Sequence, residues 1–158
     1  MRRLRTLMMS FALALGLASA TARADGVTHK VSVGGPDQDA ADHTDANFSL
    51  TAVQHADGTV TGEWTDQFGQ GQGGIHAQVN CLSVEGNTAW ISGIITSGTV
   101  NGVDVTGLPV ITEVQDNGKS ANDTPDQISF SFIGNATSCK VEPPLPLSPM
   151  THGQVTVN

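Results

Sequence analysis

The sequence predicts an all-β protein, an antiparallel β-sandwich or a small β-barrel of about seven to nine short strands. Apolar and polar residues alternate over short runs from residue 47 to the C-terminus, as in strands that bury one face. Asp-Gly and Asn-Gly pairs, which favour hairpin turns, separate some of these runs. Long runs with the period of an amphipathic helix are missing, so a helical fold is disfavoured.

Residues 1–24 are expected to be a secretory signal peptide outside the fold. MRRLRT is basic, the following LMMSFALALGLASA is apolar, and Ala22-Arg23-Ala24 matches a signal-peptidase site. Cleavage there would release a soluble secreted or periplasmic chain. Residues 25–46 are polar and acidic, and we expect an N-terminal arm with one short strand at His29–Val33. The β-domain is then expected to cover residues 47–158.

The chain is acidic, with 7 lysines and arginines, 15 carboxylates and a formal net charge of −8. Removal of the signal peptide would leave three basic and fifteen acidic residues, a net charge of −12. Such a chain repels phosphate backbones and anionic membranes. No arginine follows residue 24, so a bidentate clamp for an anion is excluded. We therefore expect no nucleic-acid partner and no membrane insertion, whereas a small-molecule, glycan or protein partner stays open.

The first hairpin is predicted from two alternating runs, 47–53 and 59–67, that flank Asp57-Gly58. Phe48 lies on the apolar side of the first run and Trp64 on that of the second. The glycine-rich stretch that follows, 68–74, lacks the lysine and the helix of a phosphate-binding loop. It is therefore expected to be a plain connection.

The run 75–84 predicts a long strand whose phase slips at Cys81-Leu82. Either a β-bulge lies there or both faces of the strand are covered. Turn residues at 85–87 lead into the next strand, which begins at residue 88. Later elements are a hairpin at Asn101-Gly102, a strand at 109–115, a polar loop at 116–127, a strand at 128–133 with Ile128, Phe130 and Phe132 inward, a proline-broken connection at 143–149, and a last strand at 153–158.

The motif C-L-x-V-x-G-N-x-A-x-I-x-G, which begins at Cys81, is followed by D-N-G at 116–118 and P-D at 125–126. A D-G-x-V-x-G-E run at 57–63 precedes it, and a later cysteine and a closing strand follow. In this order the motifs resemble a family of small uncharacterised exported bacterial β-domain proteins, over roughly residues 47–158. The resemblance implies a shared β-domain and brings no activity with it.

An even number of cysteines in an exported chain favours a disulfide between Cys81 and Cys139. The bridge would close a 58-residue loop and stabilise the fold by about 4 kcal/mol. Two separate buried thiols are the alternative. A catalytic cysteine needs a cationic neighbour, and His76, the nearest candidate, is expected on the opposite face of the strand.

The loop at 116–127 offers hard oxygen ligands that could hold Ca²⁺, namely Asp116, Asn117, Asp123 and Asp126. Alternatively, these side chains cap their own turns. The acidic run at 37–45 does not match an EF-hand loop, so a solvated arm is expected there. No other cofactor is predicted.

Trp90 is a candidate ligand-binding residue, because its position on the alternating strand suggests a half-exposed platform for a sugar ring. Packing in the core is the alternative. The five histidines show no zinc-site spacing, and no G-x-S-x-G motif of a serine hydrolase occurs. No catalytic residue is therefore assigned.

The sequence favours an exported, non-enzymatic β-domain with a structural or binding role. A domain that binds a carbohydrate or a small apolar ligand is the alternative. An enzyme that uses a metal or a pair of carboxylates is the third hypothesis.

Overall fold

The computed structural model describes residues 26–38, 45–118, 123–150 and 152–158. The expected signal peptide and the middle of the acidic run at 37–45 lie outside these residues. These residues form strands and two short 3₁₀ turns, η1 (Gly69–Gly71) and η2 (Cys139–Val141). The strands are β1 (Val27–Gln38), β2 (Asp45–His55), β3 (Val60–Phe68), β4 (Gly73–Glu85), β5 (Thr88–Val100), β6 (Val103–Asp104), β7 (Pro109–Gln115), β8 (Gln127–Ser129), β9 (Phe132–Ile133), β10 (Leu147–Pro149) and β11 (Gln154–Val157).

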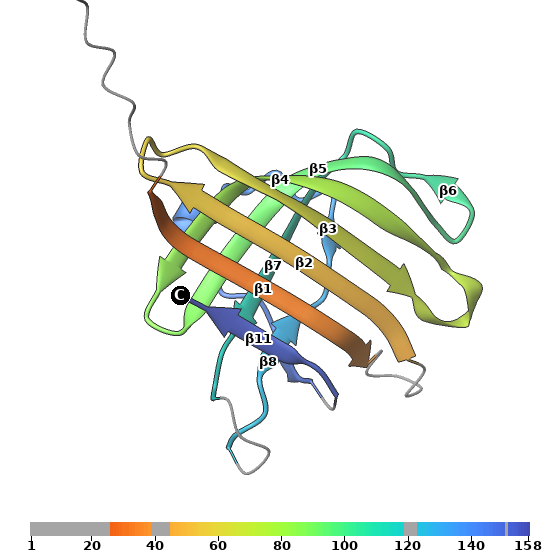
Figure 1. Ribbon diagram of the computed structural model, residues 1–158. Helices are drawn as coiled ribbons and strands as arrows, with labels where there is room; N and C mark the ends of the chain where they lie inside the picture. The colour runs from red at the N-terminus through yellow and green to blue at the C-terminus, as the bar shows by residue number, and fades with distance from the viewer. Residues whose placement is uncertain (1–25, 39–44, 119–122, 151) are drawn as a thin grey trace, which may run out of the picture.

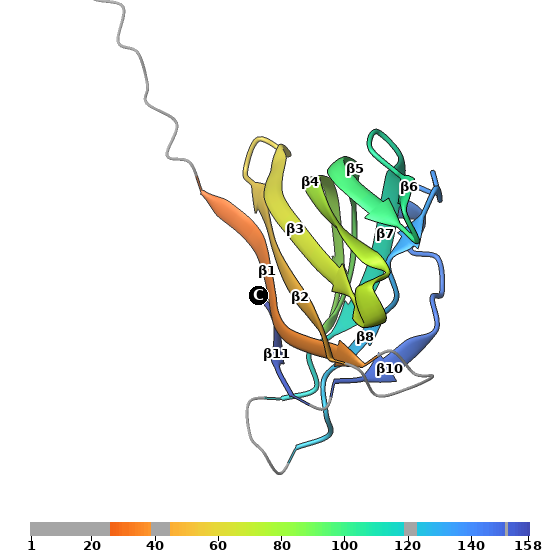
Figure 2. The same cartoon turned by 90° about the vertical axis from the view of Figure 1, so that its right-hand side faces the viewer.

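All the strands join in one antiparallel sheet with the order β10-β8-β7-β5-β4-β3-β2-β1-β11, while β6 pairs with β5 and β9 with β7. The sheet curls, so that β1, β2 and β3 lie in front of β7 and β8 (Figure 1). In the turned view, β1 and β11 lie on one side and β7 and β10 on the other (Figure 2). The all-β antiparallel prediction is confirmed, and the strands form one curled sheet.

The described residues hold eleven strands, so the expected count of seven to nine was too low. The difference comes mainly from pieces of two or three residues, such as β6, β9 and β10. Alternation cannot be recognised over so few residues, because a period of two needs several repeats to show.

β1 corrects the expectation of an N-terminal arm with one short strand at His29–Val33. The strand runs from Val27 to Gln38 and pairs along its length with β2. Its middle also pairs with β11, from Val31↔Val157 to Gly34↔Gln154. Alternation is clear only in the middle of the strand, where Val31 and Val33 are buried, and backbone pairing with β2 extends the strand on both sides.

Gly35 allows β1 to approach the loop before β11 closely. It has a φ of 142°, and a Cβ there would lie 2.5 Å from the Cα of Gly153. Only a residue without a side chain fits this approach. Gly35 is therefore required by the packing of β1 against this loop.

The core lies inside the curl and is formed by the predicted inward side chains of the long strands. Phe48, Leu50 and Trp64 are almost fully buried, and the rings of Phe48 and Trp64 lie 5.6 Å apart at a tilt of 49°. Tilted aromatic pairs of this kind add to the stabilisation that burial provides. Ser131 donates a hydrogen bond to buried Asp66, which joins the β8–β9 connection to the inner face of β3.

Phe130 does not point inward as expected. β8 ends at Ser129 and β9 begins at Phe132, so the alternation is broken between them. Phe130 is 45% exposed, whereas Ile128 is buried. The single strand expected at 128–133 is therefore two short strands with a break.

The phase slip predicted at Cys81-Leu82 is confirmed as a β-bulge. The register between β4 and β5 shifts between Val79 and Cys81, and a second shift lies between His76 and Ala77. Both faces of β4 are also covered there. Leu82 is fully buried on the inner side, and Cys81 faces residues 138–145, called the C-terminal segment below. The bulges bend the long strands and produce the curl of the sheet.

Two aspartates bind the edge of β11 that is not paired with β1; β11 is the last strand of the sheet. The backbone N–H of Val155 donates to Oδ2 of Asp126 at 2.6 Å, and that of Val157 donates to Oδ2 of Asp116 at 3.0 Å. The other oxygen of Asp126 accepts from the N–H of Asn117 at 2.8 Å. Side-chain carboxylates thus bind N–H groups that no neighbouring strand binds, and they connect β11 to the loop after β7.

We predict that Asp126→Asn lowers the free energy of unfolding by roughly 1–3 kcal/mol, because the amide offers one acceptor where two N–H donors converge. Urea denaturation followed by circular dichroism measures the change. Asp104→Asn is the matched control, since Asp104 is exposed at the end of β6 and its single backbone bond can be kept by asparagine. Equal stabilities of the two variants would contradict the role given to Asp126.

The β2–β3 turn contains a carboxylate with a shifted pKa. The hydroxyl of Thr59 donates to Oδ1 of Asp57 at 2.7 Å, and the Thr59 N–H donates to the same oxygen at 2.9 Å. These two bonds favour the charged form and hold the pKa of Asp57 below its ordinary value. Because the folded pKa is the lower one, the turn is stabilised above the unfolded pKa. This stabilisation is lost as the pH falls through the folded pKa.

Thr59→Val removes the hydroxyl, and we predict that the pKa of Asp57 rises towards its ordinary value. Carboxyl-detected NMR titration measures it directly. Thr106→Val, which removes the hydroxyl next to Asp104, should leave the pKa of Asp57 unchanged and raise that of Asp104.

Candidate functional site

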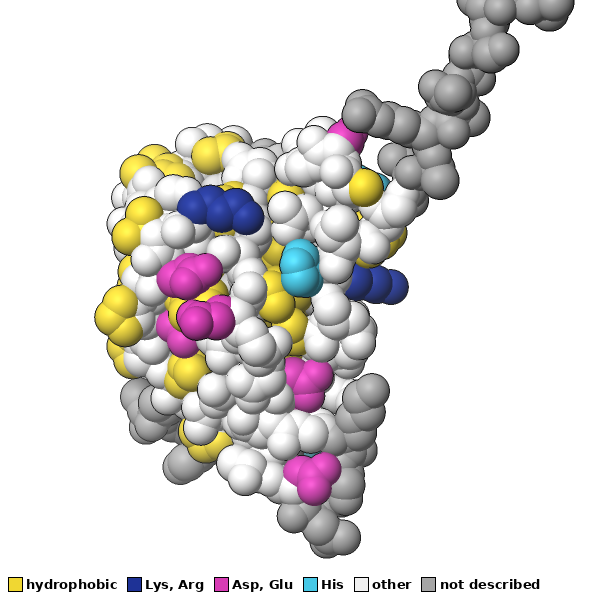
Figure 3. Space-filling view, turned by 90° about the vertical axis from the view of Figure 1, so that its left-hand side faces the viewer, with side chains coloured by type: hydrophobic (Ala, Val, Ile, Leu, Met, Phe, Trp, Pro, Cys, Tyr) yellow, Lys and Arg dark blue, Asp and Glu magenta, His cyan; other side chains and the backbone are white. Residues whose placement is uncertain are grey.

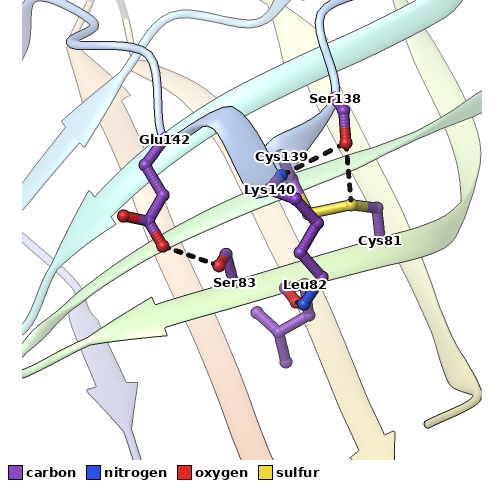
Figure 4. Close-up of a disulfide and its surroundings, with 7 residues drawn as sticks. All are labelled: Cys81, Leu82, Ser83, Ser138, Cys139, Lys140 and Glu142. Atoms are coloured by element: carbon purple, nitrogen blue, oxygen red, sulfur yellow. Dashed lines mark hydrogen bonds between the residues drawn. A yellow bond between two sulfur atoms is a disulfide. The ribbon is translucent and has the colours of Figure 1, made fainter.

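The C-terminal segment crosses the outer face of β4 and is held there by a disulfide between Cys81 and Cys139 (Figure 4). The two Cα atoms are 6.0 Å apart, and Cys139 is fully buried. Beside the bridge, Lys140 donates from Nζ to the backbone oxygen of Leu82. Ser83 donates to Oε1 of Glu142 at 2.8 Å. The disulfide prediction is confirmed, and the bridge fixes a segment that covers the sheet.

Trp90 lies under this segment and does not form an exposed platform as expected. Its side chain is only 8% exposed, and its indole N–H donates to the backbone oxygen of Pro143 at 2.9 Å. A second bond nearby runs from the N–H of Leu145 to Oε2 of buried Glu113 at 2.8 Å. Alternation along β5 places Trp90 on the outer face of the sheet, but the C-terminal segment covers it. Its contacts are those of a packing residue.

The four residues proposed as calcium ligands lie together in the loop after β7. Besides their bonds to β11, Asp116 accepts from the N–H of Gly118 at 3.2 Å, and the Asn117 amide donates to the oxygen of Pro125 at 2.9 Å. Asp123 lies against Gly118, where a Cβ would approach its Oδ2 to 2.5 Å. These contacts hold the loop and β11 together. Calcium binding stays a prediction.

Within the described ranges, no three His, Cys, Asp or Glu side chains are grouped as metal ligands. Likewise, none of the described segments forms a helix that is long and apolar enough to cross a membrane. Figure 3 shows acidic side chains that gather on one face beside a lysine, with apolar side chains scattered around them.

A polar hollow of about 590 Å³ lies on the outer face of β3, β4 and β5. Alternation brings its side chains together, because every second residue of a strand faces outward. The register sets Glu63 beside Gln78 and Thr65 beside His76. The exposed or half-exposed side chains that line the hollow are those of Thr61, Glu63, Thr65, His76, Gln78 and Thr96.

His76 is the imidazole in the lining of this hollow. Its Nδ1 lies 3.1 Å from the hydroxyl of Thr65, and its backbone oxygen accepts from the hydroxyl of Thr96 at 3.0 Å. Thr96 comes within reach because the register shift between His76 and Ala77 leaves it as the extra residue of β5. The bulge that bends the strand therefore also directs a hydroxyl towards the hollow.

Next to this hollow, the Nε2 of His55 lies 3.1 Å from the hydroxyl of Thr61. The hollow thus combines hydroxyls, an imidazole, an amide and a carboxylate on one side of a rigid sheet. Such a set can donate and accept hydrogen bonds in several directions. This arrangement suits recognition of a polar ligand.

None of the hollow's residues was proposed as a site from the sequence. The signal was present, because the run T-G-E-W-T places Thr61, Glu63 and Thr65 on one face. A polar outer face is also what any solvated strand shows. Only the pairing of β3 with β4 and the bulge in β5 bring these side chains around one hollow.

Comparison of the chain with models of protein families, with curated proteins and with solved structures gave no match.

We predict that the double variant Cys81→Ser, Cys139→Ser loses roughly 4 kcal/mol of stability, because the bridge closes a 58-residue loop in the unfolded chain. Guanidinium denaturation measures the loss, and the reduced wild-type protein should match the double variant. The fluorescence of Trp90 tests whether the segment stays on the sheet through its other bonds. An unchanged midpoint would contradict the stabilising role of the bridge.

Proposed function

We propose that this chain is an exported, non-enzymatic binding domain that holds a hydroxylated ligand, a carbohydrate, on the outer face of β3 and β4. The observation that carries the proposal is the hollow of about 590 Å³ around His76. Ligand sites are concave and contain a few well-placed polar groups on a rigid scaffold. This hollow has these properties on a sheet whose strands are fixed by long ladders.

The chemistry of the hollow favours sugar hydroxyls over other small ligands. A sugar presents many groups that both donate and accept, and the hollow offers the same dual character through Thr61, Thr65 and Gln78. The inner face of the sheet, which could enclose a small apolar ligand, is filled by large side chains such as Trp64, Phe48 and Leu50.

Export is supported by the disulfide, since such bridges persist in oxidising compartments outside the cytosol. The signal-peptide pattern at residues 1–24 points the same way. Under this proposal the protein meets glycans in the periplasm or outside the cell. The resemblance to exported β-domain proteins agrees with this setting.

The test is a screen of the purified protein, after signal removal, on an array of neutral and anionic oligosaccharides. We expect retention of neutral sugars, and about tenfold weaker binding by Gln78→Ala, which removes hydrogen bonds worth about 1.4 kcal/mol. Titration calorimetry gives the affinities.

Gln154→Ala is the matched control, because Gln154 is another exposed glutamine on a strand, β11, that does not line the hollow. Its affinity should equal that of the wild-type protein. Absence of binding to every neutral sugar would overturn the proposal. Shortened products after incubation would show an enzyme and would refute the non-enzymatic assignment.

A further inference from the structure

We propose, on the basis of this function, that the ligand is an extended neutral oligosaccharide that lies along β3 and β4, rather than a single sugar. A second hollow of about 320 Å³ adjoins the first and shares Thr65 and His76 with it. The second hollow continues along the same two strands to Phe68 and Gly73. The two hollows thus meet at the Thr65–His76 pair, and we treat them as the two halves of one groove.

The length of the groove fits a chain of linked sugars. It follows β3 from Thr61 to Phe68, which spans about 23 Å at about 3.3 Å per residue. A single sugar ring would occupy only part of this length. Along the groove, the outward residues of β3 and β4 form cross-strand pairs. Glu63 is opposite Gln78, Thr65 is opposite His76, and Gln67 is opposite Gly74.

Gly74 opens the far end of the groove. A residue with a side chain would place its Cβ 2.6 Å from the backbone oxygen of Asp66, so this position excludes larger residues. Without a side chain opposite Gln67, the surface stays low there, and the Gln67 amide is left exposed. A ligand that crosses the Thr65–His76 pair can therefore continue towards this amide.

The charge of the groove selects a neutral chain. Glu63 is an exposed carboxylate in its wall, and among the described residues that line the two hollows none is lysine or arginine. Anionic polymers are normally held by lysine and arginine, and here they would meet a negative charge instead. Hydroxyl and amide groups dominate the remaining wall and suit uncharged sugar units.

The test measures affinity against chain length by titration calorimetry. The probes are glucose chains of one to six units in two series, β-1,3-linked and β-1,4-linked, together with a matched polyuronate that carries carboxylates. We expect affinity in at least one neutral series to rise with length until the chain spans both hollows and then to level off. The polyuronate should bind at least tenfold more weakly.

Gln67→Ala and Gln78→Ala separate the two ends of the groove. Gln67→Ala should weaken the longest chains about tenfold and leave the shortest binding chain unchanged, whereas Gln78→Ala should weaken both. Gln154→Ala should change neither. Thermal melting of each variant verifies that the fold is kept.

Affinity that does not depend on length, or a Gln67→Ala effect equal for short and long chains, would overturn the extended groove while the proposed function stands. Stronger binding of the polyuronate would overturn the neutral assignment. If neither neutral series binds but another neutral sugar is retained on the array, the extended-chain inference is overturned and the proposed function stands. No binding of any neutral sugar would overturn the proposed function as well.

Discussion

The edge of β11 that is not paired with β1 sets the main constraint on the sheet, because the N–H groups of a terminal strand need hydrogen-bond partners. β11 has only four residues, and its pairing with β1 uses one of its edges. The other edge donates to Asp116 and Asp126 from the loop after β7. This contact joins β11, at one end of the strand order, to the loop between β7 and β8, near the other end. The connection thus spans the curl in which Trp64 and the other core residues are buried.

The second constraint acts from outside the curl, where the C-terminal segment covers β4, β5 and β7. The disulfide fixes one point of it, and the bonds of Trp90 to Pro143 and of Glu113 to Leu145 fix others. This covering explains why strands in the middle of the sheet have apolar or buried residues on both faces. It also leaves the outer face of β3 and the first half of β4 as open polar surface, and the groove lies there.

The groove is a consequence of how the sheet bends. The register shift at His76 makes Thr96 an extra residue of β5, whose hydroxyl reaches the backbone oxygen of His76. At the far end of the groove, Gly74 leaves space because it has no side chain. Bulges and glycines are often found where a sheet is shaped for a ligand. Here they supply both the curl that the core requires and the hollow that the proposed function uses. A change at one of them is therefore expected to affect fold and binding together, so the proposed tests use side chains in the groove wall instead.

Elements that depend on neighbours in the chain could be predicted from the sequence. Alternation indicated the inward positions of Phe48 and Trp64, and turn residues indicated the hairpins. The bridge could be predicted although its cysteines are 58 residues apart, because a chain with two cysteines and a signal-peptide pattern allows one pairing. Only the tertiary structure decided that β1 belongs to the sheet, that Trp90 is covered, and that Asp126 holds β11. The physical reason is that these features require partners far away in the sequence, whereas a local pattern reports only which face of a strand is apolar.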